Sequence, residues 1–188
     1  MTRLRLTAPM ATAASDELVL QLKRSLALFP ELGDAPVTVG VTASRRLDGL
    51  AIPSDRLIRL NPYRRRRVTY YTIGHELTHL LQPPGLGLIP SGEIQCDIWT
   101  LARDPLFWDE KPCYLQVDCD GRSWRRHAGA VASLCRQAID ERSHNRRYIM
   151  WLRQQLDRYA RTGTIAAPSL GDFSPTVAPL AAGQLRLF

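Results

Sequence analysis

The amino-acid sequence predicts an α+β fold, in which a small, mostly antiparallel sheet packs beside one amphipathic helix and additional C-terminal helices follow. Three observations lead to this prediction: short alternating apolar segments between residues 36 and 60, an apolar stripe of helical spacing across residues 68–81, and two longer amphipathic segments within residues 121–161. The chain has 188 residues, of which 45% are hydrophobic, so it can bury a sizeable core. We expect one domain over residues 1–161 and a flexible tail over residues 162–188.

The segments before residue 68 predict one helix and three strands. Residues 16–29 carry apolar side chains at helical spacing and follow Ser15, a suitable N-cap. Residues 36–42, 47–52 and 56–60 read as short strands, the first and last with clear alternation. Together these strands predict the small sheet beside the helix that follows.

The helix predicted over residues 68–81 has one apolar face. Tyr70, Ile73 and Leu77, followed by Leu80 and Leu81, recur at spacings of three and four, which makes a stripe that faces a core. The next residues, Pro83-Pro84, cannot continue a helix. The remaining side chains of the helix therefore face a different side.

His75, Glu76 and His79 lie off this stripe and form the motif His-Glu-x-x-His. Positions i and i+4 share one face of a helix, so both imidazoles can bind one zinc ion. The glutamate between them can act as a general base toward a water molecule at that ion. The competing interpretation is a solvated helix face that carries two histidines by accident.

A third ligand is required to complete such a zinc site. Glu93 is the best candidate, because it begins a second predicted helix that Ser91 would cap and that ends near Asp104-Pro105. Asp97 follows four residues later on the same face and can accept a hydrogen bond from a ligand imidazole. Both could instead be ordinary exposed charges on a helix.

The combination of His-Glu-Leu-Thr-His, a short connection and Glu-x-x-x-Asp resembles the gluzincin zinc metallopeptidases, and in its compact form the minigluzincins and ImmA/IrrE-type peptidases. The resemblance covers residues 36–105. It implies that His75, His79 and Glu93 bind one zinc ion per chain, that Glu76 is the catalytic base and that Asp97 orients a ligand. In these families an edge strand also binds the substrate by adding a peptide strand to the sheet. Residues 56–60 are either that edge or an ordinary half-buried strand.

Residues 121–161 predict two amphipathic helices with a strongly basic surface. They contain ten arginines against three acidic residues, a net charge of +7 that equals the formal net charge of the whole chain. A concentrated positive charge favours phosphate-rich partners such as DNA. Arginine outnumbers lysine 23 to 2, so a bias in base composition is the alternative explanation for the arginines, but it does not explain their clustering.

A peptidase also needs a hydrogen-bond donor for the oxyanion that forms during hydrolysis. His144, Tyr148, His127 and Tyr114 are the candidates in this chain, and the sequence does not choose among them.

The tail ends in a short apolar motif, Gln184-Leu185-Arg186-Leu187-Phe188. It resembles the clamp-binding pentapeptide of bacterial replication and repair proteins, in which the leucine and phenylalanine side chains dock into a groove of the sliding clamp. The resemblance implies partner contacts by Gln184, Leu185, Leu187 and Phe188. The alternative is a tail segment that packs on its own domain.

These observations predict a cytoplasmic zinc endopeptidase that acts on a protein or peptide substrate and is recruited to DNA or to the sliding clamp. No apolar segment reaches membrane-spanning length, and no signal peptide is expected, so we expect no membrane partner. The four cysteines lack the spacing of a second zinc site. The alternative function is a non-catalytic clamp- or DNA-associated protein with a structural or relict zinc site.

Overall fold

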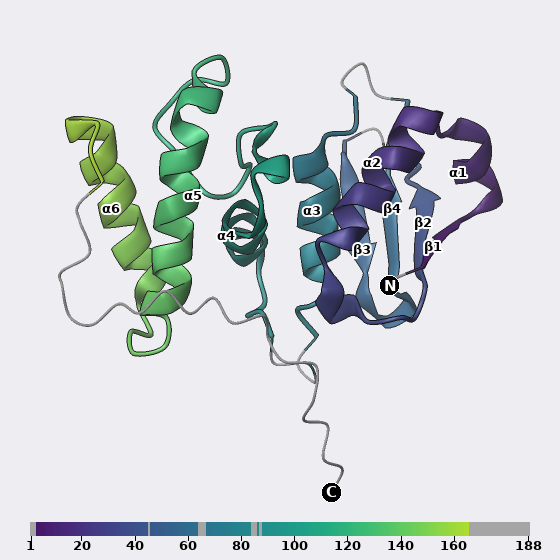
Figure 1. The fold of residues 1–188 in the computed structure, drawn as a ribbon, viewed down its shortest axis with the longest axis horizontal. Coiled ribbons are helices and arrows are strands. Elements are labelled where there is room, and N and C mark those ends of the chain that lie inside the picture. Colours follow the sequence, from purple (N-terminus) through teal and green to yellow (C-terminus); the bar gives the residue numbers. More distant parts are fainter. Residues whose placement is uncertain (1–2, 45, 64–66, 84–85, 87, 166–188) are drawn as a thin grey trace, which may run out of the picture.

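The computed structural model describes residues 3–165 except residues 45, 64–66, 84–85 and 87. The described chain contains a four-stranded sheet and six α-helices, which confirms the predicted α+β class (Figure 1). The N-terminal elements are β1 (Leu4–Leu6), α1 (Ala8–Ala13), α2 (Asp16–Ala27), β2 (Val37–Val41), β3 (Gly49–Ile52) and β4 (Leu57–Leu60). The later helices are α3 (Tyr70–His79), α4 (Glu93–Arg103), α5 (Trp124–Glu141) and α6 (Tyr148–Thr162).

The sheet is mixed, so the prediction of a mostly antiparallel sheet is wrong. Its strand order is β1-β2-β4-β3; the pairs β1–β2 and β2–β4 are parallel, and only β3–β4 is antiparallel. The physical reason lies in the connection between β1 and β2, which contains α1 and α2 and returns the chain to the same end of the sheet. The sequence analysis did not detect β1, which has only three residues.

The strand order decides between the two interpretations of residues 56–60, which form an inner strand and not the edge. β4 lies between β2 and β3, and the outer strand on that side is β3, which packs beside α3. Ile58 and Leu60 are fully buried in the core, as an inner strand requires. The edge next to the candidate site is therefore Gly49–Ile52.

The buried side chains form two clusters. The first lies between the sheet, α2 and α3 and includes Leu22, Val39, Ile58, Ile73 and Leu77. The second lies among α4, α5 and α6, and its members include Ile98, Leu101, Trp124, Val131, Leu134 and Leu152. Figure 1 shows the sheet with α1 and α2 on one side of the molecule, α5 and α6 on the other, and α3 and α4 between them. Helices α3 and α4 therefore meet where the two clusters adjoin.

The two helices begin differently, because α3 has side-chain caps and α4 has none. Thr69 accepts a hydrogen bond from the Thr72 amide, and the Asp109 carboxylate accepts from the amides of Tyr70 and Tyr71 at the start of α3. α4 begins after Gly92, whose φ of 119° suits glycine, and has no side-chain cap. The prediction that Ser91 caps α4 is therefore wrong. No helix among the described residues is long and apolar enough to cross a membrane.

Candidate metal centre

Helix α3 places His75, Glu76 and His79 on the side that faces α4 and β3. The rings of the two histidines lie edge to face, with their centroids 4.9 Å apart, as one helical turn between i and i+4 requires. His75 and Glu76 are only 6% and 7% exposed, so the face that lies off the apolar stripe is also buried. The pattern of the sequence gives no sign of this second burial, because these side chains are polar.

Helix α4 brings the Glu93 carboxylate to both histidines. Its Oε2 atom lies 3.0 Å from Nε2 of His75 and 3.2 Å from Nε2 of His79. Zinc bonds of 2.0–2.1 Å in tetrahedral geometry separate neighbouring ligand atoms by about 3.3 Å. These two nitrogens and one oxygen therefore converge as the ligands of one small cation do.

The structure also offers Cys96 as a metal ligand beside the two histidines. One ligand atom each from His75, His79 and Cys96 lies within 4.8 Å of the others, and this cluster could hold a metal ion. Without a metal ion, burial and then the nearby carboxylates raise the pKa of the Cys96 thiol, so it is protonated at neutral pH. The Glu93 oxygen is in hydrogen-bond contact with both imidazole nitrogens, so Glu93 and Cys96 are both candidates for the third ligand.

Asp97 is fully buried and accepts four hydrogen bonds. Its Oδ1 accepts from Nδ1 of His75 at 2.8 Å and from the Tyr71 hydroxyl, and its Oδ2 accepts from the amides of Tyr114 and Leu115 at 2.7 and 2.6 Å. Because a carboxylate only accepts, Nδ1 of His75 donates its proton to Asp97, which leaves Nε2 as the ring atom that could bind a cation shared with Glu93. Tyr71 precedes His75 by one helical turn, a spacing from which the sequence could have predicted this contact.

His75 is held in an acidic environment. Burial alone would lower the pKa of its imidazole, but the hydrogen bond to Asp97, the negative charges of Asp97 and Glu76 and the hydrogen bond to Glu93 outweigh that effect and raise it. Surplus negative charge of this kind also attracts a cation.

Gln82 orients the second histidine, a role that the sequence analysis did not assign. Its side-chain Nε2 donates to the carbonyls of Pro90 and Gly92 at 2.7 and 2.9 Å, so its Oε1 must be the atom 2.8 Å from Nδ1 of His79. His79 therefore donates from Nδ1 and also presents Nε2 to Glu93. The same amide fixes the connection between α3 and α4, and no local pattern in the sequence indicates this.

Glu76 lies between the histidines and the edge strand β3. Burial raises the pKa of its carboxyl from 4.5 to about 7, with the charge of His75 acting against the shift and that of Glu93 adding to it. A Cβ atom added at Gly49 would lie 2.5 Å from Oε1 of Glu76, closer than real atoms approach. Gly49 therefore leaves room for the carboxylate, and a glycine within a strand is the sequence signal that marks such a close approach.

A pocket of about 860 Å³ opens at this point. It is lined by His75, Glu76, His79 and Glu93, by Tyr114, and by residues 46–51, which lead into and include part of β3. The edge of the sheet thus forms one wall of the pocket and the candidate ligands another. Leu47 and Leu50 in this wall are 42% and 41% exposed, so the wall is partly apolar.

Of the four candidate oxyanion donors, the pocket is lined by Tyr114 and by none of the others. The Tyr148 hydroxyl forms a hydrogen bond with Gln95, and His127 forms one with the Tyr159 hydroxyl between α5 and α6. His144 is exposed in the turn before α6 and pairs with Glu141. Partial burial, followed by the charge of Glu93, raises the pKa of the Tyr114 phenol, so its hydroxyl keeps its proton at neutral pH.

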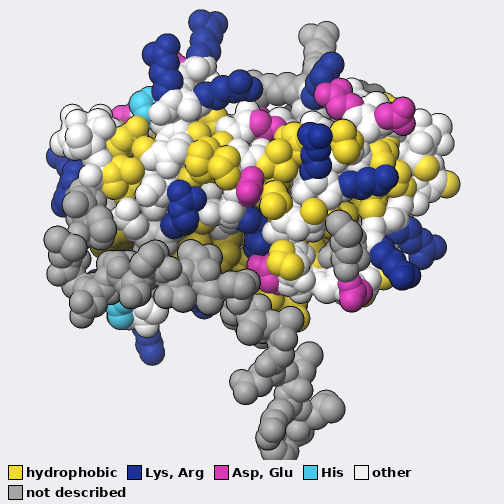
Figure 2. Space-filling view, viewed as in Figure 1, with side chains coloured by type: hydrophobic (Ala, Val, Ile, Leu, Met, Phe, Trp, Pro, Cys, Tyr) yellow, Lys and Arg dark blue, Asp and Glu magenta, His cyan; other side chains and the backbone are white. Residues whose placement is uncertain are grey.

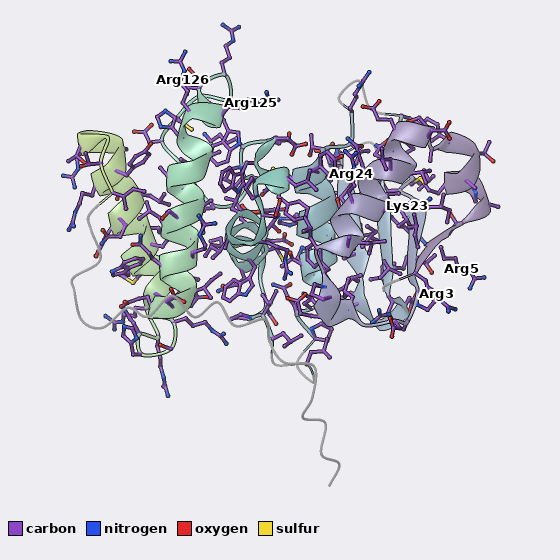
Figure 3. All side chains as sticks on the ribbon, viewed as in Figure 1. Arg3, Arg5, Lys23, Arg24, Arg125 and Arg126 are labelled. Atoms are coloured by element: carbon purple, nitrogen blue, oxygen red, sulfur yellow. The ribbon has the colours of Figure 1, made fainter. Side chains whose placement is uncertain are left out.

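All ten arginines of residues 121–161 are exposed. Figure 2 shows Lys and Arg side chains in both the left and the right part of the visible face. Figure 3 shows Arg125 and Arg126 projecting from the N-terminal end of α5. Arg142 lies over the Trp99 ring at 5.8 Å, and Arg136 donates to the Ala102 carbonyl. The predicted clamp-binding residues Gln184, Leu185, Leu187 and Phe188 lie outside the described residues.

No known family model, curated protein or solved structure matches this chain significantly.

Proposed function

We propose that the protein is a zinc-dependent endopeptidase of the gluzincin type. The observation that carries this proposal is the convergence of Glu93 Oε2 on Nε2 of His75 and of His79, at 3.0 and 3.2 Å. Two imidazoles and one carboxylate, with room for a water molecule beside them, form the ligand set of catalytic rather than structural zinc sites. A purely structural site would also have no use for the buried carboxyl of Glu76 next to the ligands.

A zinc ion at this site would polarise the scissile carbonyl and lower the pKa of a water molecule to about 7. Glu76 accepts the proton of the attacking water as the new carbon–oxygen bond forms, and later delivers it to the amine nitrogen as the carbon–nitrogen bond breaks. A carboxyl with a pKa of about 7 can both accept and release a proton near neutral pH. Asp97 and Gln82 keep both imidazoles in the correct tautomer through these steps.

The position of β3 supports a peptide substrate. It is the outer strand of the sheet, it lies beside α3, and residues 49–51 line the pocket. An outer strand leaves one row of backbone amides and carbonyls for pairing with an extended peptide. A peptide bound along β3 would place a backbone carbonyl beside the candidate ligands.

The test is to measure zinc content and casein or fluorogenic-peptide hydrolysis for the wild-type protein and the Glu76→Gln variant. We expect about one zinc per chain in both proteins, and hydrolysis in the wild type alone, because an amide cannot accept the proton of water. Glu17→Gln is the matched control, since Glu17 only forms an exposed pair with Arg67. Unchanged hydrolysis in zinc-loaded Glu76→Gln, or none in the zinc-loaded wild type, would refute the proposal.

We also propose that the protein is recruited to DNA and to the bacterial sliding clamp. The exposed arginines of α5 and α6 support the first contact, and the sequence of residues 184–188 supports the second. The two contacts should respond differently to salt, because arginine–phosphate contacts release counterions whereas the tail buries leucine and phenylalanine side chains. Deleting residues 184–188 should abolish clamp binding in a titration and leave zinc content, hydrolysis and DNA binding unchanged. Equal clamp binding by the full-length and shortened proteins would contradict this.

A further inference from the structure

The backbone that carries Tyr114 is tied to the candidate metal centre by three consecutive amides. The Cys113 amide donates to the Tyr71 hydroxyl at 3.2 Å, and the amides of Tyr114 and Leu115 donate to the Asp97 carboxylate. Leu115 is only 1% exposed and belongs to the second buried cluster. The segment is therefore held by the same carboxylate that orients His75.

The Tyr114 ring lies against His75. The two rings are stacked, with centroids 5.7 Å apart and planes inclined by 22°. The tyrosine is nevertheless 48% exposed and lines the pocket. None of the described residues forms a hydrogen bond with its hydroxyl, whereas the hydroxyls of Tyr71, Tyr148 and Tyr159 each have a partner. A hydroxyl of a pocket-lining residue with no hydrogen-bond partner in the described part of the chain is available to a ligand.

We propose that Tyr114 is a catalytic residue whose hydroxyl donates a hydrogen bond to the oxyanion of the tetrahedral intermediate. This inference rests on the proposed peptidase function. When water attacks the scissile carbon, the carbonyl π electrons move to oxygen, and a donor already in place stabilises that charge without reorganisation. The electrons return when the carbon–nitrogen bond breaks. Tyr114 exchanges no proton in these steps; Glu76 carries the proton of water to the amine.

Arg46 is the competing donor, because it also lines the pocket and carries a guanidinium group. It differs from Tyr114 in that its segment is exposed, and no hydrogen bond or ion pair among the described residues joins its side chain to the candidate ligands; its amide donates to the hydroxyl of Ser44. An oxyanion donor must be held in place before the reaction. Tyr114 meets this requirement through Asp97 and His75.

The test compares Tyr114→Phe with Tyr148→Phe and Arg46→Gln in the zinc-loaded, full-length protein. Phenylalanine keeps the ring that stacks on His75 and removes the hydroxyl alone. We expect kcat to fall by about 10²- to 10³-fold with KM nearly unchanged, the loss typical of one oxyanion donor. Zinc content should stay at the wild-type level. Tyr148→Phe should keep full kcat, because its hydroxyl bonds to Gln95 away from the pocket.

A binding measurement separates this proposal from the peptidase proposal. A phosphinic peptide carries a tetrahedral anionic group, so its affinity for Tyr114→Phe should fall by about the same factor as kcat. Hydrolysis by the wild type with full kcat and full phosphinate affinity in Tyr114→Phe would overturn the role of Tyr114 and leave the peptidase proposal standing. Losses confined to Arg46→Gln would overturn it in favour of Arg46. A zinc-loaded wild type that neither hydrolyses peptides nor binds the phosphinate would refute both proposals.

Discussion

The sheet half of the molecule, from β1 to α3, and the helical half, from α4 to α6, contribute different chemistry to one site. The sheet half, through α3, supplies two imidazoles and the buried carboxyl of Glu76, all within five residues of sequence. The helical half supplies carboxylates through Glu93 and Asp97 of α4, and the segment of Tyr114 that Asp97 anchors. Each half has its own buried cluster, and the site lies where α3 meets α4. The positions of the candidate base and the two imidazoles therefore depend on local helix geometry, whereas the position of the candidate third ligand depends on how the halves pack.

The largest effect is expected when the candidate third ligand, Glu93, is removed. Glu93→Ala should lose most of the bound zinc, because two imidazoles alone are not a complete site. Cys96→Ser is the matched variant on the same helix and should retain zinc. Zinc content after dialysis, and competition with a chelator, measure both. Zinc loss in Cys96→Ser with retention in Glu93→Ala would instead assign the third ligand to Cys96.

The next largest effect concerns the sheet half. Gly49→Ala would place a Cβ atom 2.5 Å from Oε1 of Glu76, so the carboxyl must move. A displacement of about 1 Å can cost about 10²-fold in rate, and we expect kcat to fall by that order while zinc content is unchanged. Gly129→Ala is the control, since its Cβ would meet Trp108 at an ordinary 3.6 Å. Full activity in Gly49→Ala would show that Glu76 has more freedom than this contact allows.

The sequence predicts the part of this site that depends on local helix geometry, but not the part that depends on the packing of distant elements. The i, i+4 spacing and the apolar stripe were sufficient to place His75, Glu76 and His79 on one helix, because helix geometry is local. A glycine within a strand signals a close approach, but Glu76 could not be derived as its neighbour, because the packing of β3 against α3 joins residues that are distant in sequence. Whether residues 56–60 form the edge or an ordinary half-buried strand stayed open, because nothing local distinguishes an outer strand from an inner one. Gln82 was missed for the same reason: both carbonyls that it bonds lie beyond the turn.

A smaller effect is expected from the residue that joins the halves. Asp97→Asn should weaken zinc affinity by about 10- to 100-fold, the usual cost of losing a carboxylate that orients a ligand histidine. Gln82→Ala tests the equivalent contact on His79, where a neutral amide holds the ring, and should cost less. Isothermal titration with zinc measures both. A larger loss in Gln82→Ala than in Asp97→Asn would mean that the connection after α3, rather than the buried carboxylate, organises the ligands.

The smallest predicted effect is on stability and depends on the raised pKa of Glu76. The pKa of its carboxyl is about 7 in the folded protein and 4.5 in the reference state, so folding favours the protonated form. The resulting stability is fully present below pH 4.5 and is lost as the pH rises through 7. Between pH 6 and pH 8, with chelator present, the wild type should lose about 1 kcal/mol more of its free energy of unfolding than Glu76→Gln, which has no proton to lose there. His75 titrates in both proteins, so its contribution largely cancels in the difference. Urea unfolding at the two pH values measures this difference. Equal losses of unfolding free energy in the two proteins would show that Glu76 is already ionised at pH 6. Burial of its carboxylate in the sheet half would then cost less free energy than the structure indicates.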